Sequence, residues 1–390
     1  MVIGDGAYIK KINRSLILQK IIEHEFISRA EIAKITGLNK ATISVQVADL
    51  LNEKLVQETQ QEHNTVGRRP IMLSINGNAG YVLGIDLDFK EIKFQIADLQ
   101  GNIVEVNTMA IHTEVYEEVL YILVEEIRNY KEKYSTSHYG LVQTIIGVHG
   151  TVNNDEWIQF IPRLQWSNKD LKSDIEREID IDISIENTAN LSIFAERVYK
   201  YPDSDNMLGI VLGSGIGAGI INDGKLVKGH DGYAGEIGHM IISPFGQECS
   251  CGNSGCWELY AAESVVFSQL MEKLDRPNLN YHDIKQLLAA EDPETYDVMK
   301  NFISYISIGL NNMINSYNPE TLIINSELLK VYPNAIEEIV ANLKSSVSVY
   351  GQIALSDLGK DASVLGASAL AIQNFFEVKE VVFSREEVIA

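Results

Sequence analysis

The spacing of hydrophobic residues near the N-terminus predicts a small bundle of three helices. Over residues 11–25 the apolar positions fall on one helical face, made by Ile12, Leu16, Ile17, Ile21 and Ile22. Ser28, followed three residues later by Glu31, is a capping box that opens a second helix, and Gly37 ends it. Asn39 then caps a third, longer helix. Two helices joined by a short glycine-containing turn are typical of a helix-turn-helix.

The start of the third helix and the segment after it carry the residues expected to contact DNA. Polar side chains on or near the open side of this helix are candidates for base edges and phosphates: Asn39, Lys40, Thr42, Ser44 and Gln46. Two strand-like runs around a polar tip then predict a β-wing, which completes a winged helix-turn-helix over residues 1–75. Arg68 and Arg69, beside Pro70, suit phosphates or the narrow minor groove. The alternatives are a generic three-helix surface module and, for the two arginines, a solvated linker.

From residue 80 the pattern changes to strands that alternate with helices. Three strand-like runs precede a helix at about 115–134 and a buried strand, and another strand enters a helix near residue 187. A similar order begins again with a glycine-rich strand-turn-strand at 206–229, and the last helix covers 363–376. This repetition predicts two related α/β lobes around a cleft, formed by residues 80–190 with 360–390 and by residues 191–359.

Charge is distributed unevenly between these segments. The chain carries a net charge of −22, yet residues 1–70 contain 10 Lys and Arg against 8 Asp and Glu, and the other 320 residues contain 22 against 46. The acidic body argues against non-specific nucleic-acid binding by the whole surface, so DNA binding is expected in the N-terminal segment. No apolar run approaches the ~20 residues of a membrane span, and no signal-peptide pattern is present. We therefore expect a cytoplasmic protein, which the scarcity of cysteine also favours.

All three cysteines of the chain fall within eight positions, at Cys249, Cys251 and Cys256. With His239 upstream they supply three thiolates and one imidazole, the ligands of a closed tetrahedral Zn²⁺ site. A disulfide would leave one cysteine unpaired, and unrelated buried thiols would not cluster with so many glycines. Because a closed site has no open position, it predicts a structural Zn²⁺ that shapes a neighbouring site rather than a catalytic one.

Five segments of the chain carry a recognisable combination of motifs, VLGIDLD at 82–88, IENTAN at 185–190, LGSGIGAGII at 212–221, AGEIGH at 234–239 and CSCGNSGCWE at 249–258. Together they resemble the ROK family of bacterial repressors, uncharacterised proteins and sugar kinases. The helix-turn-helix followed by GRRP resembles the repressor branch, and TGLNKATIS is most similar to xylose-operon repressors of Gram-positive bacteria. The resemblance covers essentially the whole chain. It implies an α/β protein in which a winged helix-turn-helix precedes a two-lobed actin-like (ribonuclease-H-like) domain, with a sugar between the lobes and zinc beside it.

The resemblance also implies which residues contact the sugar, namely Asn187, Glu236, His239 and Glu258. Carboxylates and an amide give bidentate hydrogen bonds to vicinal hydroxyls, and His239 can bind zinc through one ring nitrogen and donate from the other. Simpler roles are open to three of them: a helix N-cap for Asn187 and for Glu258, and a surface turn for Glu236. His149 and Arg163 stand where the family commonly has Pro and Asn, and both can alter or abolish sugar binding.

Three positions argue against the kinase branch. Asp86 is followed by Leu87-Asp88-Phe89 instead of a glycine-rich turn for ATP phosphates. Asn187 is followed by Thr188 in place of the family's catalytic Asp, and a Thr hydroxyl cannot act as a general base near neutral pH. The strand TLII leads into Asn325-Ser326-Glu327 instead of a Gly-Gly pair near the nucleotide base. Only the glycine-rich loop at 214–217 resembles a phosphate loop, and such a loop also serves tight turns.

The sequence thus predicts a sugar-responsive transcriptional repressor of a carbohydrate-utilisation operon, not an enzyme. A homodimer or homotetramer would bind double-stranded operator DNA, and a sugar, xylose on the strength of the resemblance, would release it. Two alternatives are a ROK sugar kinase with an accessory DNA-binding domain and a DNA-binding regulator that no longer responds to an effector.

Overall fold

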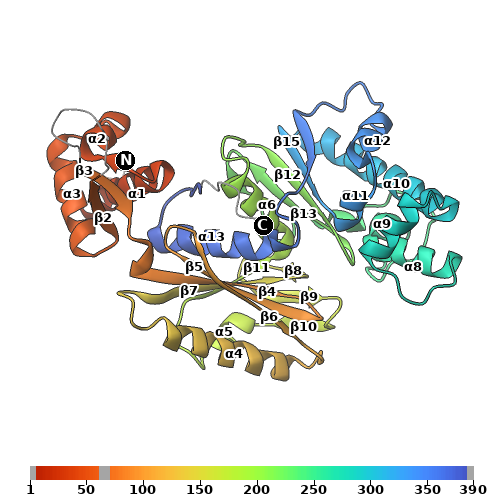
Figure 1. The fold of residues 1–390 in the computed structure, drawn as a ribbon, viewed down its shortest axis with the longest axis horizontal. Coiled ribbons are helices and arrows are strands. Elements are labelled where there is room, and N and C mark those ends of the chain that lie inside the picture. The colour runs from red at the N-terminus through yellow and green to blue at the C-terminus, as the bar shows by residue number, and fades with distance from the viewer. Residues whose placement is uncertain (1–5, 61–70, 384–390) are drawn as a thin grey trace. The chain divides into compact units, whose positions relative to one another are not determined.

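The computed structural model describes residues 6–60 and 71–383 and divides the chain into two compact units (Figure 1). Unit 1 comprises Met1–Asn187, Val198–Lys200 and Val364–Ala390, and unit 2 comprises Thr188–Arg197 and Tyr201–Ser363. The N-terminal module, expected as a separate domain, therefore shares a unit with the first lobe. The chain enters unit 2 after Asn187, returns to unit 1 for Val198–Lys200, and leaves unit 2 for the last time before Val364. No helix of the described segments is both long and apolar enough to cross a membrane.

The N-terminal part of unit 1 is a winged helix-turn-helix, as the sequence predicts. Its elements are α1 (Gly6–His24), β1 (Ile27–Ser28), α2 (Arg29–Thr36), α3 (Lys40–Asn52), β2 (Val56–Gln60) and β3 (Ile71–Ile75). Ser28 and Glu31 form the expected capping box at the start of α2, and Asn39 caps α3 through a hydrogen bond from Thr42 N. Gly37 ends α2 at φ 71°, in the left-handed region that glycine adopts without a Cβ clash. The three strands form an antiparallel sheet in the order β1-β3-β2.

The buried face of these helices differs from the predicted one at two apolar positions. Ile12 was predicted on the apolar face of the first helix, but its exposed fraction is 47%. In α2, Ile35 is also exposed, at 49%, and the helix buries Ile32 instead.

The first lobe is built on a five-stranded mixed sheet in the order β11-β7-β4-β5-β6. Helix α4 and helix α5 cover one face with a continuous apolar core, and helix α13 packs on the other, where Gln95 Nε2 donates to Ser368 Oγ. A small antiparallel sheet, β10-β9-β8, adjoins this lobe. The bounds are β4 (Gly80–Leu87), β5 (Glu91–Asp98), β6 (Ile103–Ala110), α4 (Tyr116–Lys133), β7 (Gly140–Val148), β8 (Thr151–Val152), β9 (Ile158–Ile161), β10 (Trp166–Lys169), α5 (Leu171–Glu176), β11 (Ile183–Asn187) and α13 (Ala362–Phe376).

The second lobe repeats this topology with other residues. Its sheet order is β14-β13-β12-β15-β16, with two antiparallel pairs followed by two parallel ones, as in the first lobe. Helix α6 packs on one face of this sheet through Ile193, and the remaining helices form the large core on the other. The bounds are α6 (Thr188–Tyr199), β12 (Met207–Leu212), β13 (Ile216–Asn222), β14 (Lys225–Leu226), α7 (Glu258–Ala261), α8 (Glu263–Lys273), α9 (Tyr281–Ala289), α10 (Pro293–Tyr317), β15 (Thr321–Asn325), α11 (Glu327–Val331), α12 (Ala335–Asn342) and β16 (Gln352–Leu355). The repeated lobe predicted from the sequence is confirmed by this shared strand order.

Candidate functional site

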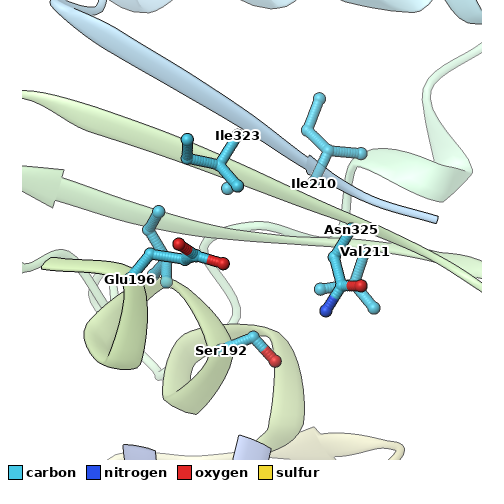
Figure 2. Close-up of a pocket in the computed structure, with 8 residues that line it drawn as sticks. Ser192, Glu196, Ile210, Val211, Ile323 and Asn325 are labelled. Carbon is cyan, nitrogen blue, oxygen red and sulfur yellow. The ribbon is translucent and has the colours of Figure 1, made fainter. Parts of the chain in front are cut away.

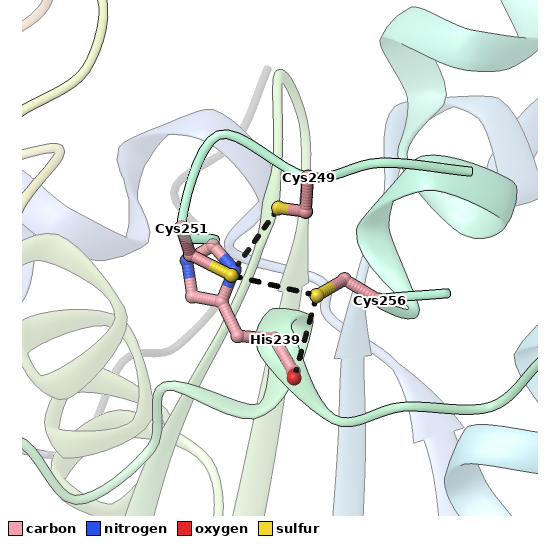
Figure 3. Close-up of side chains that lie close together, drawn as sticks. All are labelled: His239, Cys249, Cys251 and Cys256. Carbon is pink, nitrogen blue, oxygen red and sulfur yellow. Dashed lines mark hydrogen bonds between the residues drawn. The ribbon is translucent and has the colours of Figure 1, made fainter. Parts of the chain in front are cut away.

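The four predicted metal ligands lie together in unit 2. The ligand atoms of His239, Cys249, Cys251 and Cys256 all fall within 4.8 Å of one another, and in Figure 3 their side chains turn toward each other. His239 Nδ1 lies 3.6 Å from Cys249 Sγ, and Cys251 Sγ lies 3.6 Å from Cys256 Sγ. Four ligands placed ~2.3 Å from a central Zn²⁺ at tetrahedral angles would be roughly 3.8 Å apart. The 3.6 Å between the two sulfurs is far beyond a disulfide bond of ~2.05 Å. The cluster therefore has the donor set and the spacing of a tetrahedral metal site.

The loop that carries the cysteines is anchored to helix α10 by Trp257, the residue after Cys256. Trp257 is fully buried, and its indole Nε1 donates to the carbonyl of Tyr305 on α10 at 2.9 Å. Its ring packs so tightly on Gly309 of the same helix that a Cβ there would lie 2.1 Å from the ring. Gly255, at φ 83°, lets the loop pass the carbonyl of Ser243. The glycines thus allow the loop its tight turns, and the packing of Trp257 on α10 holds the neighbouring Cys256 in place.

Three of the four residues expected to contact a sugar lie beside this cluster. His239 Nδ1 is 3.3 Å from Glu258 Oε1, and the Cys249 thiol donates to the same oxygen at 3.4 Å. Because Nδ1 faces the thiols, Nε2 points away from them and remains available to another partner. Glu236 precedes the turn that carries His239, and desolvation by neighbouring atoms together with the charge of Glu258 raises the pKa of Glu236. Glu258 is the first residue of α7 and not its N-cap, which is Trp257 and makes no side-chain capping hydrogen bond, so the capping interpretation of Glu258 is not supported.

The fourth residue, Asn187, ends β11 in unit 1. Its side-chain Nδ2 donates to the carbonyl of Gly150 at 2.7 Å, which joins the end of β11 to the loop after β7. His149, in that loop, lies 2.8 Å from Asp86 Oδ1, and Arg163 lies over the ring of Phe89 at 5.4 Å. His149 and Arg163, the two departures from the pattern that the resemblance implies, therefore both contact the turn at residues 86–89.

This turn, and the segment after β15 in unit 2, hold structural contacts at the positions where the family resemblance leads one to expect nucleotide binding in a kinase. Asp88 Oδ1 accepts a hydrogen bond from Phe89 N. In unit 2, Ser326 Oγ donates to Glu263 Oε1 at 2.6 Å, and Glu263, which is 2% exposed, also accepts from Leu328 N. Tyr281 donates to its other oxygen at 2.6 Å. The segment that follows β15 is thus part of a buried hydrogen-bonded network, which sequence reasoning did not anticipate.

A small cavity lies beneath the sheet of unit 2, between α6 and strands β12 and β15 (Figure 2). Ser192, Glu196 and Asn325 place polar atoms around it, and its volume is about 10 Å³. That volume holds a single water molecule at most, so the cavity cannot accept a sugar or a nucleotide.

The DNA-facing candidates divide into two groups on α3. Lys40 and Ser44 are exposed, Asn39 is exposed at the cap, and Thr42 is half-buried. Gln46 was expected on the open side, but its exposed fraction is 4%, and that expectation is wrong. Gln46 follows Ile43 by three residues and precedes Leu50 by four, so it lies on the buried face of the helix; this spacing was visible in the sequence. Arg68 and Arg69 lie outside the described residues.

Comparison with known proteins places the chain in a family. A model of the ROK family matches residues 82–374. The chain belongs to the ROK family. Over 385 residues it is 36% identical to a protein named xylose repressor from Bacillus subtilis, covering 97% of this chain and 99% of that protein.

Two solved structures extend the comparison of this ROK protein to its fold. A crystal structure of a ROK family transcriptional regulator, described as a homolog of the E. coli MLC protein, superposes with a TM-score of 0.81 at 25% identity and covers 95% of this chain and 97% of that one. A ROK family glucokinase from Streptomyces griseus superposes with a TM-score of 0.66 at 22% identity. The match covers 100% of the glucokinase chain but only 75% of this one. The actin-like fold expected from the resemblance is confirmed, and the regulator matches nearly the full length.

Proposed function

We propose that this chain is a sugar-responsive transcriptional repressor that controls a carbohydrate-utilisation operon. The observation that carries the proposal is the union in one chain of a winged helix-turn-helix with a complete ROK domain. The full-length similarity to a protein named xylose repressor and to a ROK transcriptional regulator supports it. Xylose is the sugar we propose first, because of the name of that relative.

The metal cluster is proposed to bind one structural Zn²⁺ per chain. His239, Cys249, Cys251 and Cys256 would hold the ion, which would fix the loop and the orientation of the His239 ring. Glu236, His239, Glu258 and Asn187 are then proposed to accept and donate hydrogen bonds to sugar hydroxyls, as the family resemblance implies.

DNA binding is proposed to reside in residues 1–75. Lys40 would contact phosphates at the start of α3, together with Asn39, Thr42 and Ser44, and Arg68 and Arg69 would contribute from the wing. A homodimer would place two α3 helices in successive major grooves of a palindromic operator, and a homotetramer would contain two such pairs.

No enzymatic activity is proposed. Thr188 is buried at the start of α6 and has no group that accepts a proton near neutral pH, and the segment after β15 is occupied by the Ser326–Glu263 network. Both observations disfavour the kinase alternative, although kinases share the fold.

A thermal-shift screen with the full-length protein, loaded with zinc, tests the sugar response. The panel contains D-xylose, L-arabinose, D-glucose and N-acetyl-D-glucosamine, each with and without ATP and Mg²⁺. A sugar present at 100 times its Kd stabilises the folded state by ~2.7 kcal/mol. Glu236→Gln is the matched control, since it removes one carboxylate charge and keeps the shape of the side chain, and its shift should be smaller. If no sugar raises the melting temperature while a specific DNA is still bound, the regulator without effector is the correct alternative. A sugar phosphate formed from ATP would establish the kinase.

A further inference from the structure

The exposed face of α3 offers few hydrogen-bonding groups that are free to read bases. Asn39 Oδ1 accepts from Thr42 N at 2.8 Å, so the amide cannot make the bidentate pair with adenine that needs both its oxygen and its nitrogen. Ser44 Oγ donates its proton to the carbonyl of Lys40 at 2.8 Å. Gln46 is buried. Hydrogen-bond readout by α3 is therefore weaker than the polar sequence of this helix indicates.

The exposed large apolar side chain on α3 is Val45, with an exposed fraction of 58%. It is the sixth residue of the helix, within the part that reaches base edges in helix-turn-helix proteins. A valine contributes little to folding there, because the side chain is not buried and a β-branched residue has a lower helix propensity than alanine. The contacts that join the module to the rest of unit 1 include the carbonyl of Glu53, which accepts from Tyr139 OH, and Ser15, which donates to the carbonyl of Glu377. Val45 takes part in neither contact and stays exposed.

We propose that Val45 determines part of the operator sequence by van der Waals contact with the C5-methyl groups of thymine in the major groove. This inference rests on the proposed DNA-binding function and adds the chemical basis of its specificity. The thymine methyl is the apolar group that distinguishes T·A from the other base pairs in that groove, and apolar side chains recognise it. Lys40, the exposed first residue of α3, would hold the helix to the DNA backbone by charge and carries no sequence information. Specificity would thus come from methyl contacts as well as from any hydrogen bonds of Thr42.

The test uses the full-length protein and a duplex that it selects from a random 30-base-pair pool. Each thymidine of the selected duplex is replaced in turn by deoxyuridine, which removes only the C5-methyl group. Affinities are measured by fluorescence anisotropy at one fixed salt concentration, since salt dominates the phosphate contribution. The same series is measured with Val45→Ala and with Ile12→Ala, a control residue on α1 that is exposed to a similar extent (47%).

At one or two thymidines per half-site, deoxyuridine should weaken binding of the wild-type protein on the order of fourfold, the effect of burying about one methyl group. Val45→Ala should weaken binding of the unmodified duplex by a similar factor and should be insensitive to deoxyuridine at the same positions. Ile12→Ala should behave as wild type. Circular dichroism should show Val45→Ala folded, because alanine favours the helix more than valine does.

Two results would overturn the inference, and they are distinguishable. If every deoxyuridine duplex binds within twofold of the parent while a scrambled duplex binds more weakly, the protein is a specific DNA-binding protein but Val45 does not read thymine methyls. If the selected and scrambled duplexes bind equally, the proposed repressor function fails and the inference fails with it.

Discussion

Asp86 and His149 form a charged pair at the end of β4 in unit 1. Partial burial disfavours the protonated imidazole, but the charge of Asp86 and its hydrogen bond outweigh that cost and raise the pKa of His149 to about 9, with a smaller contribution from Asp88. Because the pKa is raised above its ordinary value of 6.5, the pair stabilises the fold fully below pH 6.5 and loses this contribution as the pH rises through about 9. Two-fifths of the His149 side chain is exposed, so solvent screening keeps the gain below ~1 kcal/mol.

An NMR titration of the His149 imidazole measures this effect. Asp86→Asn should lower the pKa of His149 by more than Asp88→Asn, the matched control that removes a charge without removing the hydrogen bond. The difference in stability between wild type and Asp86→Asn should shrink between pH 7 and pH 10. A wild-type His149 that titrates near 6.5 would show that the pair does not form.

Cys251 is the exposed member of the metal cluster, so its replacement tests zinc binding with little disturbance of packing. Wild-type protein purified without chelator should contain one zinc per chain by elemental analysis. Cys251→Ser should lose most of the zinc and melt at a lower temperature, because a missing ligand opens the shell and metal binding is coupled to folding of the loop. Ser250→Ala, next to it, should keep both. Absence of zinc from the wild type, or unchanged zinc in Cys251→Ser, would refute the metal site.

Residues whose roles depend on near neighbours in sequence were predictable, and those that depend on packing were not. Ser28, Glu31 and Asn39 cap helices within three residues, so their spacing was sufficient. The four residues proposed to bind metal could be predicted to lie together because three of them are cysteines in one loop. Glu263, in contrast, meets Ser326 across 63 residues of chain, and no local pattern marks that pair.

At the scale of elements, the segment after α13 connects the C-terminal part of unit 1 to α1. Ser15 donates to the carbonyl of Glu377, and Gln19 Nε2 donates to Glu380 Oε1 at 2.9 Å. Val381 is fully buried in this segment. The sequence marked α13 as the last helix but gave no sign that the residues after it would pack beside the first one, because that contact spans nearly the whole chain.

Val381→Ala should therefore lower the free energy of unfolding by ~1–3 kcal/mol, the effect of removing buried apolar surface. The loss should also increase amide hydrogen exchange in α1, to which the segment is attached. Val347→Ala, at a position 74% exposed, should change stability by less than ~0.5 kcal/mol. Urea unfolding and hydrogen exchange of both variants measure this, and equal behaviour of the two would show that the segment does not support α1.

At the scale of the whole molecule, the strand order repeated in the two lobes was visible as a repeated pattern along the sequence. The assignment of Val198–Lys200, at the end of α6, to unit 1 was not, because hydrophobic periodicity does not report which body a helix end belongs to. The fold itself is shared by ROK regulators and kinases, so the residues of the site have to decide between them.

Those residues predict that ATP and Mg²⁺ yield no phosphorylated pentose or hexose with this protein. Thr188→Asp alone should remain inactive, because Asp88 still occupies the turn after β4 and the Ser326–Glu263 network still fills the segment after β15. Mass spectrometry of the reaction mixture measures any sugar phosphate formed, with a ROK glucokinase as the positive control. Turnover above background in the wild type would contradict the repressor assignment.

The most direct test of the central claim is the affinity of the full-length protein for its selected operator with and without saturating sugar. If sugar and operator are coupled through the fold, D-xylose or another sugar of the panel should weaken operator binding by about 5- to 150-fold, and operator should weaken sugar binding by the same factor. Glu236→Ala should bind the operator as wild type does without sugar but should not be released. Operator affinity that stays the same in wild-type protein across every sugar would contradict the account.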